Sequence, residues 1–305
     1  MARLAFLFPG QGSQHAQMGA ELLEDPELRD LCARCAERAG IDLAELLTRA
    51  PDEELRLTQH AQPALCFTGI ALARLLQRRG IVADALSGHS VGEYAALCVA
   101  GAVTPEDAVA AVHERGRAMA AASPPGESSM AAVLGLPPHE VEKVIEGVPD
   151  VWPANFNTPT QTVIAGRTQP LDEAGELLRQ AGARKVMGLN VSAAFHTPLM
   201  APAASALRRV LEAIEWRNPA ASVVANLTAQ PYRGAAEIPA QLELQLRSPV
   251  RWSDCVAELA RQRCNTFIEL GPKRALSGMM RELVPDATAV AVATPSACAE
   301  LAVPA

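Results

Sequence analysis

The residues Gly88-His89-Ser90-Val91-Gly92 fit the pattern G-x-S-x-G, which places a serine nucleophile on a sharp turn. An apolar run at 81–86 precedes the motif and a helical pattern begins at Val91, so the motif has the strand–turn–helix context that it needs. The helix N-terminus would bring backbone N–H groups beside the Ser90 oxygen. A helix start capped by a serine is the simpler alternative, but this context favours a nucleophile.

A serine nucleophile needs a base, and His196 is the best candidate among the six histidines. It follows the strand-like run 191–195 and precedes Thr197-Pro198, and the end of a strand is where an α/β enzyme keeps its chemistry. Asp254 and Glu269 are both possible acids for a third member, and nothing favours either. The other histidines are interpreted as structural or surface residues, except that His15 could line a site: His15, His60, His89, His113 and His139.

The glycine-rich segment 10–15 also follows an apolar run. A dinucleotide-binding fingerprint would need a third glycine where His15 stands, so that interpretation fails. Beside a nucleophile turn, the segment fits better as a second backbone donor to an oxyanion. Cys32 and Cys35 form a lone C-x-x-C within a helical run, which indicates two thiols on a helix face rather than a redox or zinc site.

The hydrophobic pattern predicts an α/β scaffold for these residues. Short apolar runs alternate with helical patterns, which indicates a mostly parallel sheet. Between 128 and 190 the order becomes strand–helix–strand–strand–helix–strand, which is typical of a ferredoxin-like arrangement. We therefore expect a large subdomain of residues 1–127 and 191–305 and an inserted small subdomain of residues 128–190.

The composition of the 305-residue chain is that of a globular protein, with 49% hydrophobic and 20% charged residues. Its net charge of −7 argues against sequence-independent binding of nucleic acid. The seven scattered cysteines predict reduced thiols. Because the sequence shows neither a signal peptide nor a membrane span, we expect a soluble cytoplasmic protein. We also expect the protein to be a monomer.

Seven sequence blocks resemble the malonyl-CoA:acyl-carrier-protein transacylases and the acyltransferase domains of polyketide synthases. The blocks occur in family order across almost the whole chain. They are Phe8-Pro9-Gly10-Gln11-Gly12-Ser13-Gln14, Gly88-His89-Ser90-Val91-Gly92-Glu93-Tyr94-Ala95-Ala96-Leu97, Phe195-His196-Thr197-Pro198-Leu199-Met200, and the segments 58–65, 155–159, 245–252 and 269–272. The resemblance implies an α/β-hydrolase-like large subdomain with a ferredoxin-like small one.

The resemblance also implies a role for each matching residue. Ser90 would be the acylated nucleophile, His196 its base, and a carbonyl of Gln245 would orient the histidine. The backbone N–H groups of Gln11 and Val91 would form the oxyanion hole. Four further residues would bind the acyl group: Arg115, which would grip a malonyl carboxylate, Phe195, which would favour malonyl over methylmalonyl, and Gln62 and Asn155, which would line the pocket.

The expected reaction is ping-pong transfer of a malonyl group from CoA to the phosphopantetheine thiol of an acyl carrier protein, without a metal or redox cofactor. Because such carriers are usually acidic, docking would need a basic patch, for which Arg78-Arg79, Arg184-Lys185 and Lys273-Arg274 are candidates. The alternatives are an editing thioesterase of the same fold, a transferase of larger acyl groups between carrier proteins, and an inactive docking protein. Two departures from the family pattern, Ser128-Ser129 and Lys273-Arg274, are expected to lie away from the chemistry.

Overall fold

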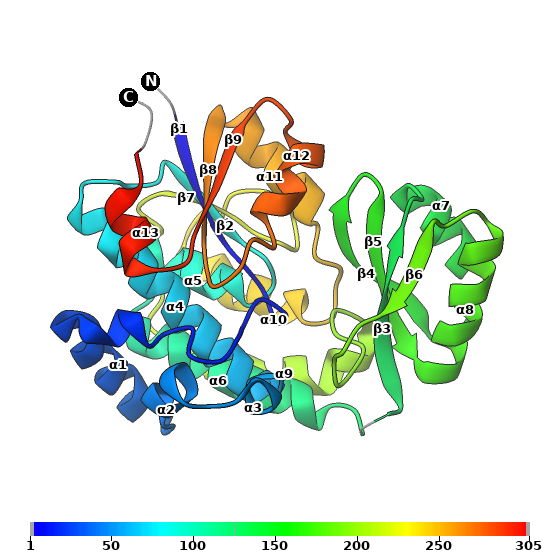
Figure 1. Ribbon diagram of the computed structural model, residues 1–305. Helices are drawn as coiled ribbons and strands as arrows, with labels where there is room; N and C mark the ends of the chain where they lie inside the picture. Colours follow the sequence, from blue (N-terminus) through cyan, green and yellow to red (C-terminus); the bar gives the residue numbers. More distant parts are fainter. Residues whose placement is uncertain (1–2, 125, 303–305) are drawn as a thin grey trace.

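A computed structural model describes residues 3–124 and 126–302 of the chain. Its larger part is built on a parallel five-stranded sheet in the order β7-β2-β1-β8-β9 (Figure 1). The strands are β1 (Arg3–Phe8), β2 (Ala85–Gly88), β7 (Ser222–Val224), β8 (Cys264–Leu270) and β9 (Thr288–Val292). Because all five strands run the same way, their carboxyl ends meet at one edge, where α/β enzymes bind ligands.

Helices cover both faces of this sheet, so its strands are apolar on both sides. Along β1, Leu4, Phe6 and Phe8 belong to the main core, whereas Ala5 and Leu7 face a second cluster formed with helices α11 (Trp252–Arg261) and α12 (Ser277–Leu283). The helices of the larger part are α1 (Pro26–Ala39), α2 (Leu43–Thr48), α3 (Asp52–Leu55), α4 (Thr58–Arg78), α5 (Gly92–Val99), α6 (Pro105–Ala121), α9 (Ala201–Glu212), α10 (Ile238–Gln245), α11 (Trp252–Arg261), α12 (Ser277–Leu283) and α13 (Pro295–Glu300).

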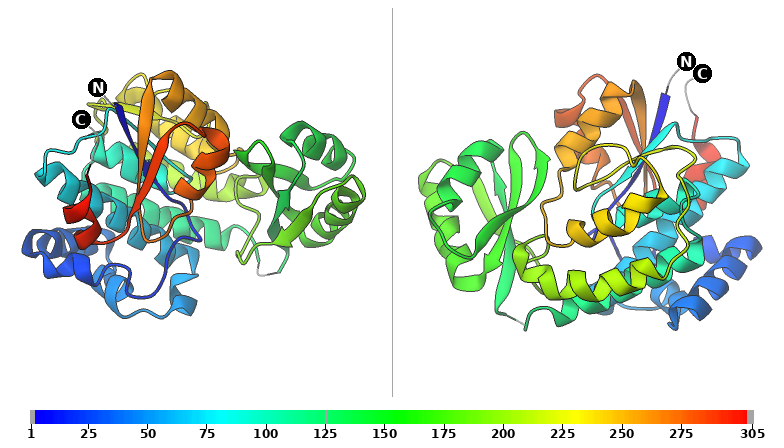
Figure 2. Two further views of the ribbon diagram at one scale, coloured as in Figure 1. Left: turned by 45° about the horizontal axis from the view of Figure 1, so that its top comes forward. Right: turned by 180° about the vertical axis from the view of Figure 1, so that it is seen from behind.

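A second, antiparallel sheet stands beside the first (Figures 1 and 2). Its order β4-β5-β3-β6, with two helices on one face, is the ferredoxin-like arrangement that the sequence predicts. Its elements are β3 (Ser128–Leu134), α7 (Pro138–Ile145), β4 (Val151–Thr158), β5 (Gln161–Arg167), α8 (Thr168–Gln180) and β6 (Lys185–Gly188). The two sheets confirm the predicted fold class, and we propose the boundaries 128 and 190 for the small subdomain.

The other face of the antiparallel sheet joins the main hydrophobic core. Met130, Ala132 and Val163 alternate with residues that face α7 and α8, and they pack instead with side chains of the large part. Backbone hydrogen bonds between β4 and the segment before α11 add to this contact, with Phe156 N to Val250 O at 2.9 Å and Val250 N to Ala154 O at 2.9 Å. The small sheet therefore packs through one apolar face against the large part of the molecule.

Helix α4 begins earlier than the sequence predicts. The helical pattern of the sequence predicts a helix over 63–79, but the helix begins at Thr58 and contains Pro63. A proline inside a helix leaves the carbonyl four residues earlier without its helical donor, here that of Gln59. The ring of His113 on α6 meets this carbonyl, with Nδ1 3.2 Å from Gln59 O. The histidine thus compensates for the proline, which a local reading of the sequence does not reveal.

Several other elements also differ from expectation. Strand β2 begins at Ala85 rather than 81, and just before it the Asp84 carboxylate accepts a hydrogen bond from Leu4 N at 2.8 Å. Strand β9 and the helices α2, α3, α10 and α13 were not predicted at all. The strand-like run 191–195 before His196 forms no strand, so His196 lies in a loop. Among the described helices, none is long and apolar enough to cross a membrane.

Candidate active site

Ser90 lies on a very tight turn between β2 and α5. Its backbone has φ of +54°, an uncommon conformation for a residue with a side chain. A Cβ atom at Gly88 would lie 2.0 Å from the carbonyl carbon of Gly92, and one at Gly92 would lie 2.1 Å from Phe8 O. Both positions therefore require glycine, and together they allow the turn to present Ser90 at the carboxyl end of the sheet.

Asn226, at the end of the neighbouring strand β7, braces this turn. Its Oδ1 accepts a hydrogen bond from Ser90 N at 2.7 Å, and its Nδ2 donates to Gly88 O at 2.7 Å. The sequence analysis missed Asn226, although a polar residue directly after a strand of the same sheet was a usable signal. The asparagine fixes the backbone of the nucleophile without touching the Ser90 hydroxyl.

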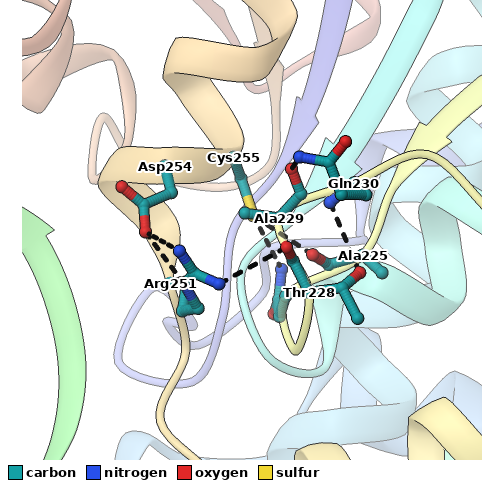
Figure 3. Close-up of polar contacts among 8 residues, drawn as sticks. Ala225, Thr228, Ala229, Gln230, Arg251, Asp254 and Cys255 are labelled. Carbon is teal, nitrogen blue, oxygen red and sulfur yellow. Dashed lines mark hydrogen bonds and ion pairs between the residues drawn. The ribbon is translucent and has the colours of Figure 1, made fainter.

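The loop that carries Asn226 is itself held against the start of α11 (Figure 3). Cys255 Sγ lies 3.4 Å from Ala225 O, and Arg251, which pairs with Asp254, places Nη1 3.5 Å from Thr228 O. Asp254, one of the two acids considered for a triad, therefore has a structural partner. Glu269, the other acid, accepts hydrogen bonds from backbone N–H groups at the start of α12.

His196 meets both Ser90 and Gln245. Its Nε2 is 2.8 Å from Ser90 Oγ, and its Nδ1 is 2.8 Å from the backbone carbonyl oxygen of Gln245. Because a carbonyl only accepts, Nδ1 carries the proton and Nε2 is free to accept the Ser90 hydroxyl proton. The carbonyl is available because α10 ends at Gln245, where helical carbonyls lack partners within the helix.

The surroundings of His196 keep its ring neutral. The side chain is 4% exposed, and burial, reinforced by the nearby Arg115 cation, lowers the pKa of His196 to about 3. At neutral pH the imidazole therefore has a free lone pair, which is the state that a general base requires. Like Ser90, His196 has a positive φ, +61°, so the chain holds both residues in an uncommon backbone conformation.

Arg115 projects from α6 to the nucleophile. Its Nη2 donates to Ser90 Oγ at 3.0 Å and to Gln245 Oε1 at 3.0 Å, and its Nη1 donates to Gln62 Oε1 at 2.7 Å. The side chain is 1% exposed, its Nε has no partner among the described residues, and its guanidinium lies over the ring of Tyr94 at 5.8 Å. Burial lowers the pKa of Arg115, but a guanidinium stays charged at neutral pH.

A small cavity connects these groups, with a volume of ≈ 90 Å³. Its lining includes eight of the nine residues that the sequence analysis named, namely Gln11, Gln62, Ser90, Val91, Arg115, Asn155, Phe195 and His196. The ninth, Gln245, lies behind Arg115 and His196. The rest of the lining is His89 together with apolar side chains that were not predicted: Met119, Met130, Leu189 and Val191. The cavity thus offers one cation among neutral polar and apolar side chains.

The two backbone groups expected at an oxyanion hole border this cavity. Neither Gln11 nor Val91 uses its N–H in a hydrogen bond to another described residue. The loop of Gln11 is anchored by its side chain, whose Nε2 donates to Thr58 Oγ1 at 3.2 Å. Lys273 Nζ lies 3.3 Å from Gly12 O in the same loop.

Among the described residues, Ser128 and Lys273 make no hydrogen bond to Ser90 or His196, but each contacts a backbone segment close to a candidate site residue. The buried Ser128 Oγ accepts a hydrogen bond from Ala194 N at 3.1 Å, two residues before His196. Lys273 touches the loop of Gln11, as described above. Both residues therefore support backbone segments that carry candidate site residues. The sequence could not show this, because each contact joins segments that are far apart along the chain.

His89 has a structural role, as expected, but it also borders the cavity. Its Nε2 is 3.0 Å from Asn157 Oδ1 on β4, and its ring lies 5.5 Å from that of Trp252. Burial lowers the pKa of His89, so it is neutral at neutral pH. The contact ties the nucleophile turn to the small subdomain.

The cysteines lie apart from this site. All seven are buried and unpaired in the part of the chain that the structure describes, and burial raises the pKa of each thiol. Cys32 and Cys35 lie on α1, as expected of two helix-face thiols. Within the same residues, no cluster of three histidine, cysteine or acidic side chains is arranged to hold a metal ion.

The fold and the site together define a class of α/β enzymes in which a serine, activated by a histidine, carries an acyl group. Comparison with known sequences places the chain within that class. The chain belongs to the family described as acyl transferase domain, whose model matches residues 5–296, and its curated relatives include malonyl CoA-acyl carrier protein transacylases.

The Bacillus subtilis transacylase is 40% identical, over 97% of this chain and 95% of its own. A solved transacylase from Xanthomonas oryzae is 41% identical with a TM-score of 0.94, and covers 98% of this chain and 97% of its own. A second solved structure, of a malonyl-transacylase in complex with its type II PKS acyl-carrier protein, is 36% identical with a TM-score of 0.94 and covers 98% of both chains.

Proposed function

We propose that this protein transfers a malonyl group from CoA to the phosphopantetheine thiol of an acyl carrier protein. The observation that carries the proposal is a buried guanidinium, Arg115, at hydrogen-bond distance from the candidate nucleophile in a small cavity. An arginine offers paired N–H donors that match a carboxylate, and malonyl is a short acyl group that ends in one. The names of the relatives given above support the same activity.

The first half-reaction acylates Ser90. The Ser90 hydroxyl gives its proton to His196 Nε2 as its oxygen attacks the thioester carbonyl, and the Gln245 carbonyl stabilises the resulting imidazolium through Nδ1. The N–H groups of Gln11 and Val91 stabilise the oxyanion of the tetrahedral intermediate. The carbon–sulfur bond then breaks, His196 returns the proton to the departing sulfur, and CoA leaves as a thiol.

The second half-reaction reverses these roles with a different thiol. The phosphopantetheine thiol of the carrier protein gives its proton to His196, and its sulfur attacks the Ser90 ester. The ester bond breaks, and Ser90 recovers the proton from the imidazolium. CoA and phosphopantetheine thus act as substrate and as a group carried by the partner. The mechanism serves fatty-acid and polyketide synthesis equally, because the acceptor decides the pathway.

The residues that line the cavity also affect which acyl group the site prefers. The ring of Phe195 is 5% exposed and lines the cavity next to His196. An α-methyl branch on malonyl would have to occupy space in a cavity of only ≈ 90 Å³ that this ring already narrows. We therefore propose malonyl rather than methylmalonyl as the preferred group, with Gln62 and Asn155 shaping the pocket and Gln62 also holding Arg115.

Intact-protein mass spectrometry tests this function directly. Brief mixing of the wild-type protein with malonyl-CoA is expected to add the mass of one malonyl group, and the Ser90→Ala variant should show no adduct. A holo acyl carrier protein should then remove the group and gain the same mass. Acetyl-CoA should give far less adduct. If water clears the adduct as fast as the carrier protein does, the protein is instead an editing thioesterase.

The three candidate basic patches for carrier docking differ in their exposure and in the partners of their cations. Arg78 pairs with Asp25 and Glu27, and Arg79 binds backbone carbonyls near the end of the described chain, so this pair has structural partners. Arg184 and Lys185 are exposed at the start of the edge strand β6 in the small subdomain. Lys273 and Arg274 are exposed at the carboxyl end of β8, beside the loop of Gln11.

We expect Arg274→Glu to weaken transfer to the carrier protein while leaving acylation by malonyl-CoA intact. Reversing an exposed charge at an interface rim mainly slows association, so the effect should appear as an about threefold to tenfold rise in KM for the carrier, and it should shrink in high salt. The matched control is Arg184→Glu, an equal charge change at the other patch. An equal effect of both variants would show that overall charge, not this patch, matters.

A further inference from the structure

Glu93 is a buried carboxylate that lies close to the site without contacting the candidate nucleophile or base. It lies on α5, is 1% exposed, and takes part in no salt bridge of the described residues. Three donors surround it: Asn226 N at 3.1 Å and Gln245 Nε2 at 2.8 Å meet Oε2, and the Tyr232 hydroxyl meets Oε1. Since all three groups can donate, they favour the ionised carboxylate and oppose the effect of burial, which raises the pKa of Glu93.

The side-chain amide of Gln245 lies between this carboxylate and Arg115. Its Nε2 donates to Glu93 Oε2 at 2.8 Å, and its Oε1 accepts from Arg115 Nη2 at 3.0 Å. An ionised carboxylate can only accept and a guanidinium can only donate, so these two neighbours allow only one orientation of the amide. If the amide were flipped, donors would face donors and acceptors would face acceptors.

We propose that Glu93 is a positioning residue that acts through the Gln245 amide to orient Arg115, and that it thereby sets the preference for an acyl group bearing a carboxylate. The inference rests on the malonyl-transfer function proposed above. It assigns Glu93 no contact with the substrate.

The separation of the two charges is what makes this arrangement useful. A buried cation needs a counter-charge, because an uncompensated charge in the interior is costly. A carboxylate in direct contact with Arg115 would supply one but would also occupy the donors that a substrate carboxylate needs. With the amide between them, Glu93 provides the charge at longer range, and the guanidinium keeps unused donors, including Nε, which has no partner among the described residues.

Glu93 also reaches the nucleophile turn, so its test must separate selectivity from general damage. Asn226, whose backbone N–H binds Glu93, braces Ser90, and Gln245 Nε2 donates to Ser90 O at 3.1 Å. Disturbing the turn would slow acylation by every acyl-CoA. Misplacing Arg115 would instead slow acylation by malonyl-CoA more than by acetyl-CoA. The informative quantity is therefore the ratio of the two acylation rate constants.

The experiment is single-turnover acylation of Ser90, followed by quench and intact mass, with malonyl-CoA and acetyl-CoA at pH 8. We expect Glu93→Gln to lower the ratio of the malonyl to the acetyl rate constant about tenfold, the change that loss of one charge-assisted hydrogen bond produces. Tyr232→Phe is the matched control, since it removes a donor from Oε1, the oxygen that Gln245 does not contact; its ratio should stay within about twofold of wild type.

A second variant tests the same link between Glu93 and Arg115 by changing Gln245 itself. Gln245→Met keeps the backbone carbonyl that holds His196 and removes the amide, so it should lower the ratio similarly, and the double variant should lower it no further. Should Glu93→Gln fail to fold, the ratio for Gln245→Met decides. An unchanged ratio, or an equal loss of both rate constants, overturns the inference. Failure of the wild-type protein to take a malonyl group would instead overturn the proposed function.

Discussion

Replacing His196 by alanine is expected to slow acylation of Ser90 by malonyl-CoA about 10²- to 10⁴-fold, the range that a positioned general base contributes. The hydroxyl would keep its hydrogen bond from Arg115 but would lose the acceptor that lies 2.8 Å from its oxygen. Release of CoA would suffer too, because the same imidazole returns the proton to the leaving sulfur. The effect should therefore appear in both half-reactions.

Rapid quench with intact mass measures the acylation step, and thiol release into a coupled assay measures turnover. His139→Ala, an exposed histidine on α7, is the matched control and should leave both rates unchanged. If His196→Ala acylated at the wild-type rate, another group would have to be the base, and the 2.8 Å contact with Ser90 would have no catalytic meaning.

The lowered pKa of His196 gives this prediction a pH signature. Burial and Arg115 lower the pKa to about 3, so the acid limb of kcat/KM is expected well below the ordinary histidine value of about 6.5. The same shift affects folding. Below about pH 6.5 the unfolded chain takes up a proton that the folded protein does not, so the stability contributed by the neutral ring is present above that pH and is lost as the pH falls toward 3.

The parts of the site that sequence predicts well are those set by a local pattern. The turn that carries Ser90 needs glycines at 88 and 92, and a strand and a helix on either side; all of these lie within 20 residues of one another. The six elements of the small subdomain were also predicted in the right order. Along this one continuous segment, apolar residues repeat every second residue in the strands and about every 3.6 residues in the helices.

The parts that sequence reasoning from single residues missed depend on contacts between distant segments. Asn226 is 136 residues from Ser90, and Glu93 reaches Gln245 across 152 residues. The group that orients His196 is a backbone carbonyl, which every residue possesses, so no side-chain type marks it. Only the family resemblance singled out Gln245, and it drew attention to neither Asn226 nor the amide that joins two buried charges.

Arg115 was predicted from the family resemblance alone, because an isolated arginine on a helix would ordinarily be interpreted as an exposed charge. Replacing it by methionine keeps a long unbranched side chain and removes the cation. We expect kcat/KM for malonyl-CoA to fall about 100-fold or more, since breaking a buried charge pair costs at least about 3 kcal/mol and each 1.4 kcal/mol is a factor of ten. Acetyl-CoA, which brings no carboxylate to pair with the buried guanidinium, should lose little or gain.

Steady-state transfer with both acyl-CoAs measures this reversal of preference. Arg117→Met on the same helix is the matched control, because Arg117 is exposed and forms a surface ion pair with Glu114. The pH profile then separates charge from shape. Arg115 is one cause of the lowered His196 pKa, so its removal should move the acid limb of kcat/KM for acetyl-CoA to higher pH. An equal loss with both acyl-CoAs and an unmoved limb would show that Arg115 only fills space.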